Sequence, residues 1–162
     1  MAVPTRNSRT MKTLGSARCF FVTAKTSMGR ALLQTERNAL LLIAVIRSYA
    51  RAGKFEVHDF VVMPNHLHLL MTVGSEMTIE KAVQLVKGGF SYRLKKETGY
   101  DGEVWQRGFS EVRVMDSEHR GDCQEYIAHN PVKAGLVSSP EAFPFCYRPL
   151  AMQKAAGAKA RQ

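Results

Sequence analysis

Cysteine is scarce in this 162-residue sequence and follows no disulfide or metal-binding pattern. The three cysteines, Cys19, Cys123 and Cys146, are odd in number and widely spaced, and no CxxC pair occurs. A disulfide framework or a zinc knuckle is therefore not indicated. Long apolar runs are also missing: the longest, ALLLIAVI at 39–46, falls far short of the roughly 20 residues that a membrane span needs. The first residues lack the apolar core of a signal peptide, so we expect a reduced, soluble, cytoplasmic protein with no membrane partner.

Acidic residues are absent from the first 35 positions, because Glu36 is the first carboxylate in the chain. The chain as a whole has a net charge of +9, which favours a polyanionic partner such as a nucleic acid. We interpret residues 1–16 as a basic arm, 17–150 as a single domain with its own core, and 151–162 as a mobile basic tail. The cations near the start of the chain that we expect to contact DNA are Arg6, Arg9, Lys12 and Arg18.

Strands are predicted in three stretches rich in β-branched and aromatic residues, at 18–25, 55–63 and 66–73. The turn dipeptide Pro64–Asn65 joins the last two as a hairpin. The glycine-punctuated segment 103–115 supplies one or two further strands.

Helices are predicted where apolar residues recur at spacings of three and four. The first of these runs from about Ala39 to Gly53, and the second, over 79–94, is weakened in its middle by Gly88–Gly89. A last helix runs over 117–130, where Pro131 ends or kinks it. The resulting order, β-α-β-β-α-β with a C-terminal helix, predicts an α+β, ferredoxin-like fold. In that fold two helices cover one face of an antiparallel sheet, and the last helix lies over the open face.

Two histidines lie in the otherwise apolar strand VMPNHLHLL. Because alternate side chains share a face of a strand, His66 and His68 point one way while Leu67 and Leu69 point into the core. Two imidazoles at this spacing can bind one divalent metal ion and leave positions open for substrate. Taken alone, an HxH motif is a weak indication of a metal site, because one buried structural histidine and one on the surface explain it better.

The segment EYIAHNPVKAGLV places Tyr126 and Asn130 one turn apart on the last helix. A tyrosine can act as a nucleophile that forms a covalent intermediate, and an amide one turn away could bind a metal or a phosphate. Tyr126 could instead pack its ring on the sheet, and an asparagine before proline is a common helix stop.

Cations mixed with aromatic side chains occupy VKGGFSYRLKK and VWQRGF, which is the combination that binds single strands. A solvated helix face is the alternative explanation. The cations concerned are Lys87, Arg93, Lys95, Lys96 and Arg107.

Four motifs occur in this order along the chain: MPNHLHLLM, KGGFSYRLKK, WQRGFSEVRV and YIAHNPVKAGLV. On these motifs the chain resembles the REP-associated tyrosine transposases, a single-tyrosine branch of the HUH nucleases. The likeness covers about residues 17 to 148. It implies that His66 and His68 bind a divalent metal, Mg or Mn, that Asn130 completes the metal site, and that Tyr126 is the nucleophile.

The resemblance also implies a single-stranded DNA endonuclease and strand transferase that acts on hairpin-forming repeats. Its intermediate would be a covalent 5′-phosphotyrosine with a free 3′-OH, and we prefer a monomer to a dimer. Val112 departs from relatives that carry a histidine or another polar residue there. Two alternatives stay open: a domesticated protein that binds DNA hairpins without cutting, and an unrelated metal-dependent hydrolase that uses the HxH pair.

Overall fold

Four antiparallel strands form a single sheet in the computed structural model, which describes residues 16–147. The strand order across the sheet is β2-β3-β1-β4, so the first strand in the chain lies in the interior of the sheet. The predicted cations Arg6, Arg9 and Lys12 and the predicted tail at 151–162 lie outside the described residues. The strands are β1 (Arg18–Lys25), β2 (Glu56–Met63), β3 (His66–Val73) and β4 (Ser110–Val114).

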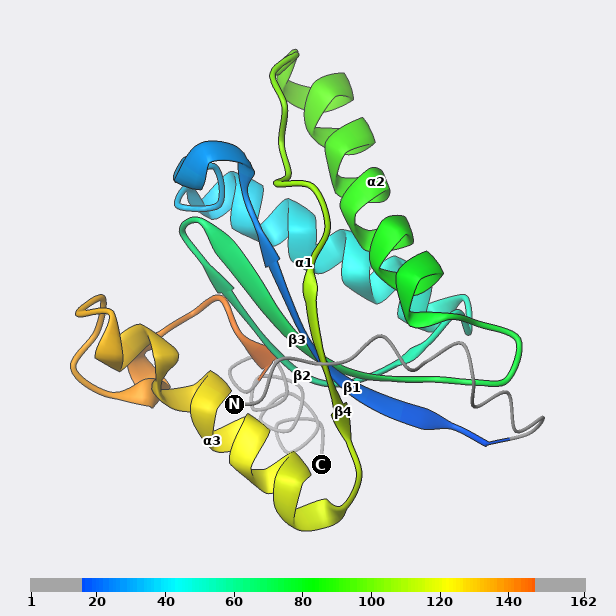
Figure 1. The fold of residues 1–162 in the computed structure, drawn as a ribbon. Coiled ribbons are helices and arrows are strands. Elements are labelled where there is room, and N and C mark those ends of the chain that lie inside the picture. The colour runs from blue at the N-terminus through cyan, green and yellow to red at the C-terminus, as the bar shows by residue number, and fades with distance from the viewer. Residues whose placement is uncertain (1–15, 148–162) are drawn as a thin grey trace, which may run out of the picture.

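The helices form a layer on each face of the sheet (Figure 1). Two of them pack on one face, and the third crosses the opposite face (Figure 1). Short 3-10 turns, η2 (Ser27–Gly29) and η3 (Pro140–Ala142), complete the connections. The α+β class and the predicted element order are therefore confirmed. The helices are α1 (Glu36–Arg51), α2 (Ile79–Thr98) and α3 (Ser117–Lys133).

Alternation along β3 divides the buried side chains between two cores. Leu67, Leu69 and Met71 belong to the larger core under α1 and α2. Leu70, two residues beyond His68, belongs to a smaller core with Cys123 and Ile127 of α3. Because residues two apart on a strand share a face, both histidines lie on the α3 face, as the sequence predicts.

Helix α2 continues without a break through Gly88 and Gly89, where the sequence indicates a weak point. A Cβ atom built on Gly89 would lie 3.0 Å from ring and methyl carbons of Tyr49 and Val45 on α1. The missing side chain therefore lets the two helices approach closely. A Cβ on Gly88 would meet nothing within 4 Å.

The predicted end of the last helix is wrong by about one turn. Pro131 lies inside α3, which continues to Lys133 before Gly135 adopts a left-handed conformation with φ of 74°. Proline lacks only its own N–H donor and clashes with the turn before it, so the few residues after it can stay helical. Pro131 is also buried, which holds this last turn on the protein.

Within residues 16–147, no helix is both long and apolar enough to cross a membrane.

Candidate active site

Four residues predicted from the sequence lie together between the sheet and α3. Strand β3 contributes His66 and His68, whose ring centroids are 4.7 Å apart. Helix α3 contributes Tyr126, whose ring lies edge-on to the His68 ring at a centroid distance of 5.3 Å. Asn130, one turn further along α3, places its amide Nδ2 3.3 Å from His68 Nε2. The i, i+4 spacing thus brings both α3 side chains onto the histidine pair.

Hydrogen bonds fix the protonation of the two imidazoles. The Nδ2 of Asn130 is a donor, so the facing Nε2 of His68 carries a lone pair and its Nδ1 carries the proton. That Nδ1 lies 2.9 Å from the hydroxyl oxygen of Thr23, which can accept a hydrogen bond from it. His66 is arranged in the same way, with Nδ1 2.7 Å from the amide oxygen of Asn65. Each histidine therefore presents an unprotonated Nε2, the form that binds a metal.

Burial and neighbouring positive charge keep both imidazoles neutral. The pKa of His68 is lowered to about 3, first by burial and then by the charges of His66 and Lys25. The pKa of His66 is lowered by burial and by Lys25, and a hydrogen bond with Asn130 partly opposes this. Both groups are thus ready to act as ligands at neutral pH, and they remain neutral in more acidic solution than an ordinary histidine does.

His68 is buried, although the sequence places both histidines on the open face of the sheet, away from the core. Only 5% of its surface is exposed. Its ring stacks on Phe21 at a centroid distance of 5.3 Å and an interplanar angle of 16°, while Tyr126 covers its edge. That expectation is corrected for His68, because α3 closes over the open face of the sheet at this point.

Two site residues on β1 are missed by the sequence motifs. Thr23 pairs with His68 across β1 and β3, and Lys25 pairs with His66. Cross-strand partners share a face of the sheet, so both β1 side chains lie beside the histidines. Their place at the site depends on how β1 and β3 are aligned, and the sequence around Thr23 and Lys25 does not indicate this alignment.

Two of the predicted DNA-binding cations are engaged within the fold. The Arg18 guanidinium donates to the carbonyl oxygens of Gly74 and Met77, at 3.3 and 2.8 Å, and only 9% of the residue is exposed. It therefore braces the segment before α2, and we leave it out of the proposed DNA contacts. The Lys87 ammonium donates to the carbonyl oxygens of Gln106 and Gly108, at 3.0 and 2.8 Å.

The other predicted cations are divided between two places. Arg93, Lys95 and Lys96 lie towards the end of α2, on the opposite face of the sheet from α3. Arg93 forms an ion pair with Glu97 at 3.7 Å. Arg107 is exposed and lines a pocket together with Lys25, the β1 residue that pairs with His66.

Val112, at the position where the resemblance leads us to expect a histidine or another polar residue, packs as an apolar side chain. It pairs with Phe21 on β1 and packs against the smaller core. It therefore widens the apolar surface on which the His68 ring is stacked.

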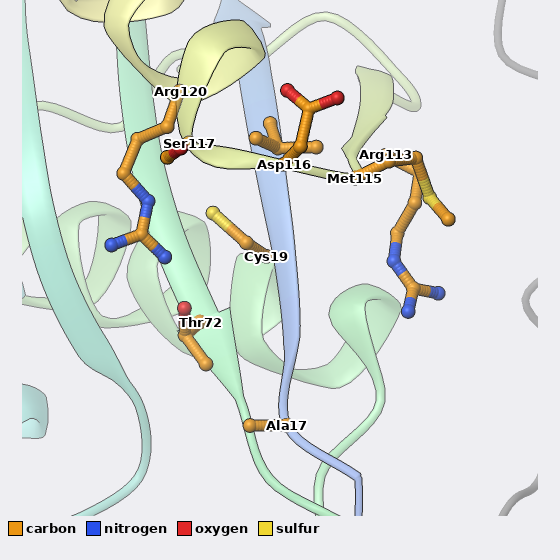
Figure 2. Close-up of a pocket in the computed structure, with 9 residues that line it drawn as sticks. Ala17, Cys19, Thr72, Arg113, Met115, Asp116, Ser117 and Arg120 are labelled. Atoms are coloured by element: carbon orange, nitrogen blue, oxygen red, sulfur yellow. The ribbon is translucent and has the colours of Figure 1, made fainter.

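A separate pocket lies at the N-terminal end of α3 (Figure 2). In it the Arg120 side chain extends towards Thr72 of β3, while the Arg113 side chain points away on the other side of β1 (Figure 2). Thr72 is four residues beyond His68, a separation of roughly 13 Å along a strand. This pocket is thus distinct from the histidine pair, although α3 covers both.

In the described part of the chain, no group of three or more His, Cys, Asp or Glu side chains is arranged to hold a metal ion. The available donors at the site are therefore two imidazole nitrogens and the Asn130 amide.

A family model described as Transposase IS200 like matches residues 22–130, which include all four site residues. The REP-associated tyrosine transposase of Escherichia coli K12 is 26% identical over 127 residues, covering 78% of this chain and 73% of that protein. A candidate REP-associated tyrosine transposase of Haemophilus influenzae is 29% identical over 102 residues, covering 56% of this chain and 57% of that protein. The match thus spans little more than half of the Haemophilus relative.

The fold is similar to that of a REP-associated tyrosine transposase whose structure was solved bound to a REP hairpin. The TM-score is 0.68 with 24% sequence identity, and the match covers 80% of this chain and 75% of that one.

Proposed function

Because this chain belongs to the family of IS200-like transposases, we propose that it cuts and rejoins single-stranded DNA through a covalent bond to Tyr126. The observation that carries the proposal is the contact of Tyr126 and Asn130 with His68 between α3 and β3. A nucleophile and a pair of neutral imidazoles facing one another is the arrangement that metal-assisted phosphoryl transfer needs.

The donors present fit a divalent metal. Two unprotonated Nε2 atoms, on His66 and His68, can bind a divalent transition metal, and the amide oxygen of Asn130 would add the oxygen ligand that Mg²⁺ and Mn²⁺ favour. When bound, such an ion would polarise a phosphate oxygen as a Lewis acid. The amide of Asn130 would rotate to present its oxygen, since its nitrogen faces His68 here.

Tyr126 is placed to reach a phosphate from solvent while remaining anchored by its ring. The residue is 39% exposed, and its ring packs on His68 and on Phe21. Attack by its oxygen would form a bond to phosphorus as the bond from phosphorus to the 3′ oxygen breaks. The tyrosine proton is released, and the leaving 3′ oxygen takes one up. Attack by a 3′-OH on the phosphotyrosine reverses these steps, so the strand is rejoined without an external energy source.

A single strand is the proposed substrate because a phosphate has to enter the site with its neighbouring bases unpaired. The hairpin bound by the structural relative supports hairpin-forming DNA as the class. We propose a monomer as the active species, because Tyr126 contacts His68 of the same polypeptide.

The test uses a 5′-labelled and a 3′-labelled hairpin oligonucleotide with single-stranded flanks, incubated with Mg²⁺ or Mn²⁺. Wild type is expected to form a denaturation-resistant adduct through the 5′ phosphate and to release a free 3′-OH. Tyr126→Phe keeps the ring and removes the oxygen, so it should bind DNA normally and form no adduct. Cutting at an undiminished rate by this variant would mean that water is the nucleophile. Binding without cutting by wild type would identify a non-cutting hairpin-binding protein.

A further inference from the structure

We propose that the pocket between the end of β1 and the segment 106–110 is a nucleotide subsite, which holds the nucleotide adjoining the phosphate at the histidine pair. The inference rests on the proposed function and adds to it where, and by which residues, a neighbouring nucleotide is held. The residues that carry it are Thr23, Lys25, Gln106, Arg107, Phe109 and Ser110.

The pocket shares a wall with the histidine pair. Thr23 lines it and also bonds His68 through its hydroxyl oxygen. Lys25 lines it and pairs with His66 across the strands. Ser110 pairs with Thr23 on the other side of β1. The row His68–Thr23–Ser110 therefore runs directly from the site into the pocket, across three neighbouring strands that span roughly 10 Å.

The pocket has the chemistry that a nucleotide requires. Lys25 and Arg107 are both exposed, and neither forms an ion pair with another residue of the described range 16–147. Two unpaired cations favour a phosphate. Phe109 is half-buried against the larger core and gives an aromatic surface for a base, while Gln106 supplies an amide that can bond a base edge.

The wall of the pocket is held in place before any ligand binds. The Lys87 ammonium bonds the carbonyl oxygens of Gln106 and Gly108 from the side of α2. The backbone N–H of Gln106 donates to the carbonyl oxygen of Lys25 at 2.9 Å. Trp105 adds an indole bond to the Lys87 carbonyl oxygen at 3.0 Å. A preformed wall lowers the ordering cost of binding, and it makes Lys87 a positioning residue instead of a phosphate contact.

The test measures equilibrium binding by a Tyr126→Phe protein, so that no strand is cut. The probes are fluorescein-labelled 12-nucleotide strands of dT, of dA and of abasic sites, which carry the same backbone charge. Lys25→Met should weaken binding to all three alike and reduce the slope of log affinity against log salt by about 0.7, the value for one single-strand phosphate. Lys25→Arg should restore both quantities.

Phe109→Leu should weaken binding to the dT and dA strands by about fivefold or more, as expected for loss of one stacked base. It should leave the abasic strand unaffected. Arg120→Ala is the matched control, because it removes one positive charge from the separate pocket at the other end of α3 (Figure 2). Arg120→Ala should leave the difference between base-containing and abasic strands unchanged. It should also not reduce the slope of log affinity against log salt in the way that Lys25→Met does.

The inference is overturned if Lys25→Met behaves like Arg120→Ala. It is also overturned if Phe109→Leu affects the abasic strand as strongly as dT, or affects neither. The binding results can be told apart from the proposed cutting reaction. If the subsite binds DNA as described but wild type never cuts, only the proposed cutting reaction is contradicted. A protein that binds none of the three strands would contradict both.

Discussion

At the scale of single residues, the hydroxyl of Thr23 lies beside His68, which we propose as a metal ligand. It lies 2.9 Å from His68 Nδ1, and a hydrogen bond accepted there keeps the ring proton on Nδ1 and a lone pair on Nε2. Thr23→Val keeps the shape of the side chain and removes its hydroxyl, which is the hydrogen-bond acceptor. The tautomer of His68 that carries its proton on Nδ1 is then no longer stabilised. Loss of such a supporting bond typically costs about 10- to 100-fold in metal affinity or activity.

Titration of the protein with Mn²⁺, together with single-turnover cutting of a labelled hairpin, measures this effect. Thr23→Ser, which retains a hydroxyl, is the control and should stay close to wild type. Equal metal affinity in the Val variant and wild type would show that the Thr23 bond does not set the ligand form.

Because the pKa of His68 is lowered, the free energy of unfolding should depend on pH. Its pKa is about 3 in the folded protein and about 6.5 in an unfolded chain. Between these values the unfolded state binds a proton that the folded state does not, so stability is lost as the pH falls below 6.5. From pH 7 to pH 5 this one group should reduce the free energy of unfolding by about 2 kcal/mol.

Urea unfolding at pH 7, 6 and 5 measures this loss. His68→Gln removes the titrating group and keeps a polar side chain of similar length, so its stability should depend less on pH by that amount. Parallel pH profiles for the two proteins would mean that His68 is not held neutral by burial. His58, whose pKa is lowered by burial and by Arg120 and not by His68, contributes equally to both profiles. The charge of His66 contributes to the lowered pKa of His68, so the difference between the profiles includes this interaction.

Among single residues, motifs predict the four central side chains but not their neighbours. Two-residue spacing places His66 and His68 on one face of a strand, and four-residue spacing places Tyr126 and Asn130 on one face of a helix. Thr23 precedes its partner His68 by 45 positions, and no local pattern indicates that pairing. The burial of His68 is missed for a related reason, since it depends on how closely α3 approaches the sheet.

At the scale of elements, the paired glycines of α2 have different roles. Gly89 lies against Tyr49 and Val45 of α1, whereas Gly88 faces open space. Gly88→Ala should therefore stabilise the protein by about 0.5–1 kcal/mol, the usual gain for this change in a helix. Gly89→Ala should gain less than this, because the added Cβ crowds the neighbouring helix.

Thermal unfolding of the two alanine variants gives the comparison, with Gly89→Val as a third variant that should destabilise clearly through overpacking. An equal rise in melting temperature for both alanine variants would contradict the close approach of α1 and α2 at Gly89.

Element types follow from sequence periodicity more reliably than element ends do. The strands at 18–25 and 66–73 match the observed β1 and β3, because each is a continuous run of β-formers bounded by turns. The end of α3 differs, since burial of Pro131 outweighs the local signal that a proline gives. The continuity of α2 differs for a similar reason: packing against α1 offsets the low helix propensity of two glycines.

At the scale of the whole molecule, the positive side chains are spread over both sides of the sheet and do not all lie near the histidine pair. A net charge of +9 indicates a polyanionic partner but not the face that meets it. Lys95 and Lys96 lie on the opposite side of the sheet from the histidine pair, and Arg18 is used within the fold. The strand order β2-β3-β1-β4 decides this distribution, and it arises from packing between segments far apart in the chain.

The contact of Tyr126 with His68 within one polypeptide has a consequence for enzyme kinetics. Under the proposed function, Tyr126 as nucleophile and the two imidazoles of one molecule would need no encounter with a second copy. Specific activity, the rate per mole of protein at saturating DNA, should therefore stay constant when the protein is diluted from micromolar to low nanomolar concentrations. A site assembled from two chains would instead lose activity as the assembly dissociates, giving a rate that falls with the square of concentration at the dilute limit. A dilution series at fixed DNA excess distinguishes the two behaviours.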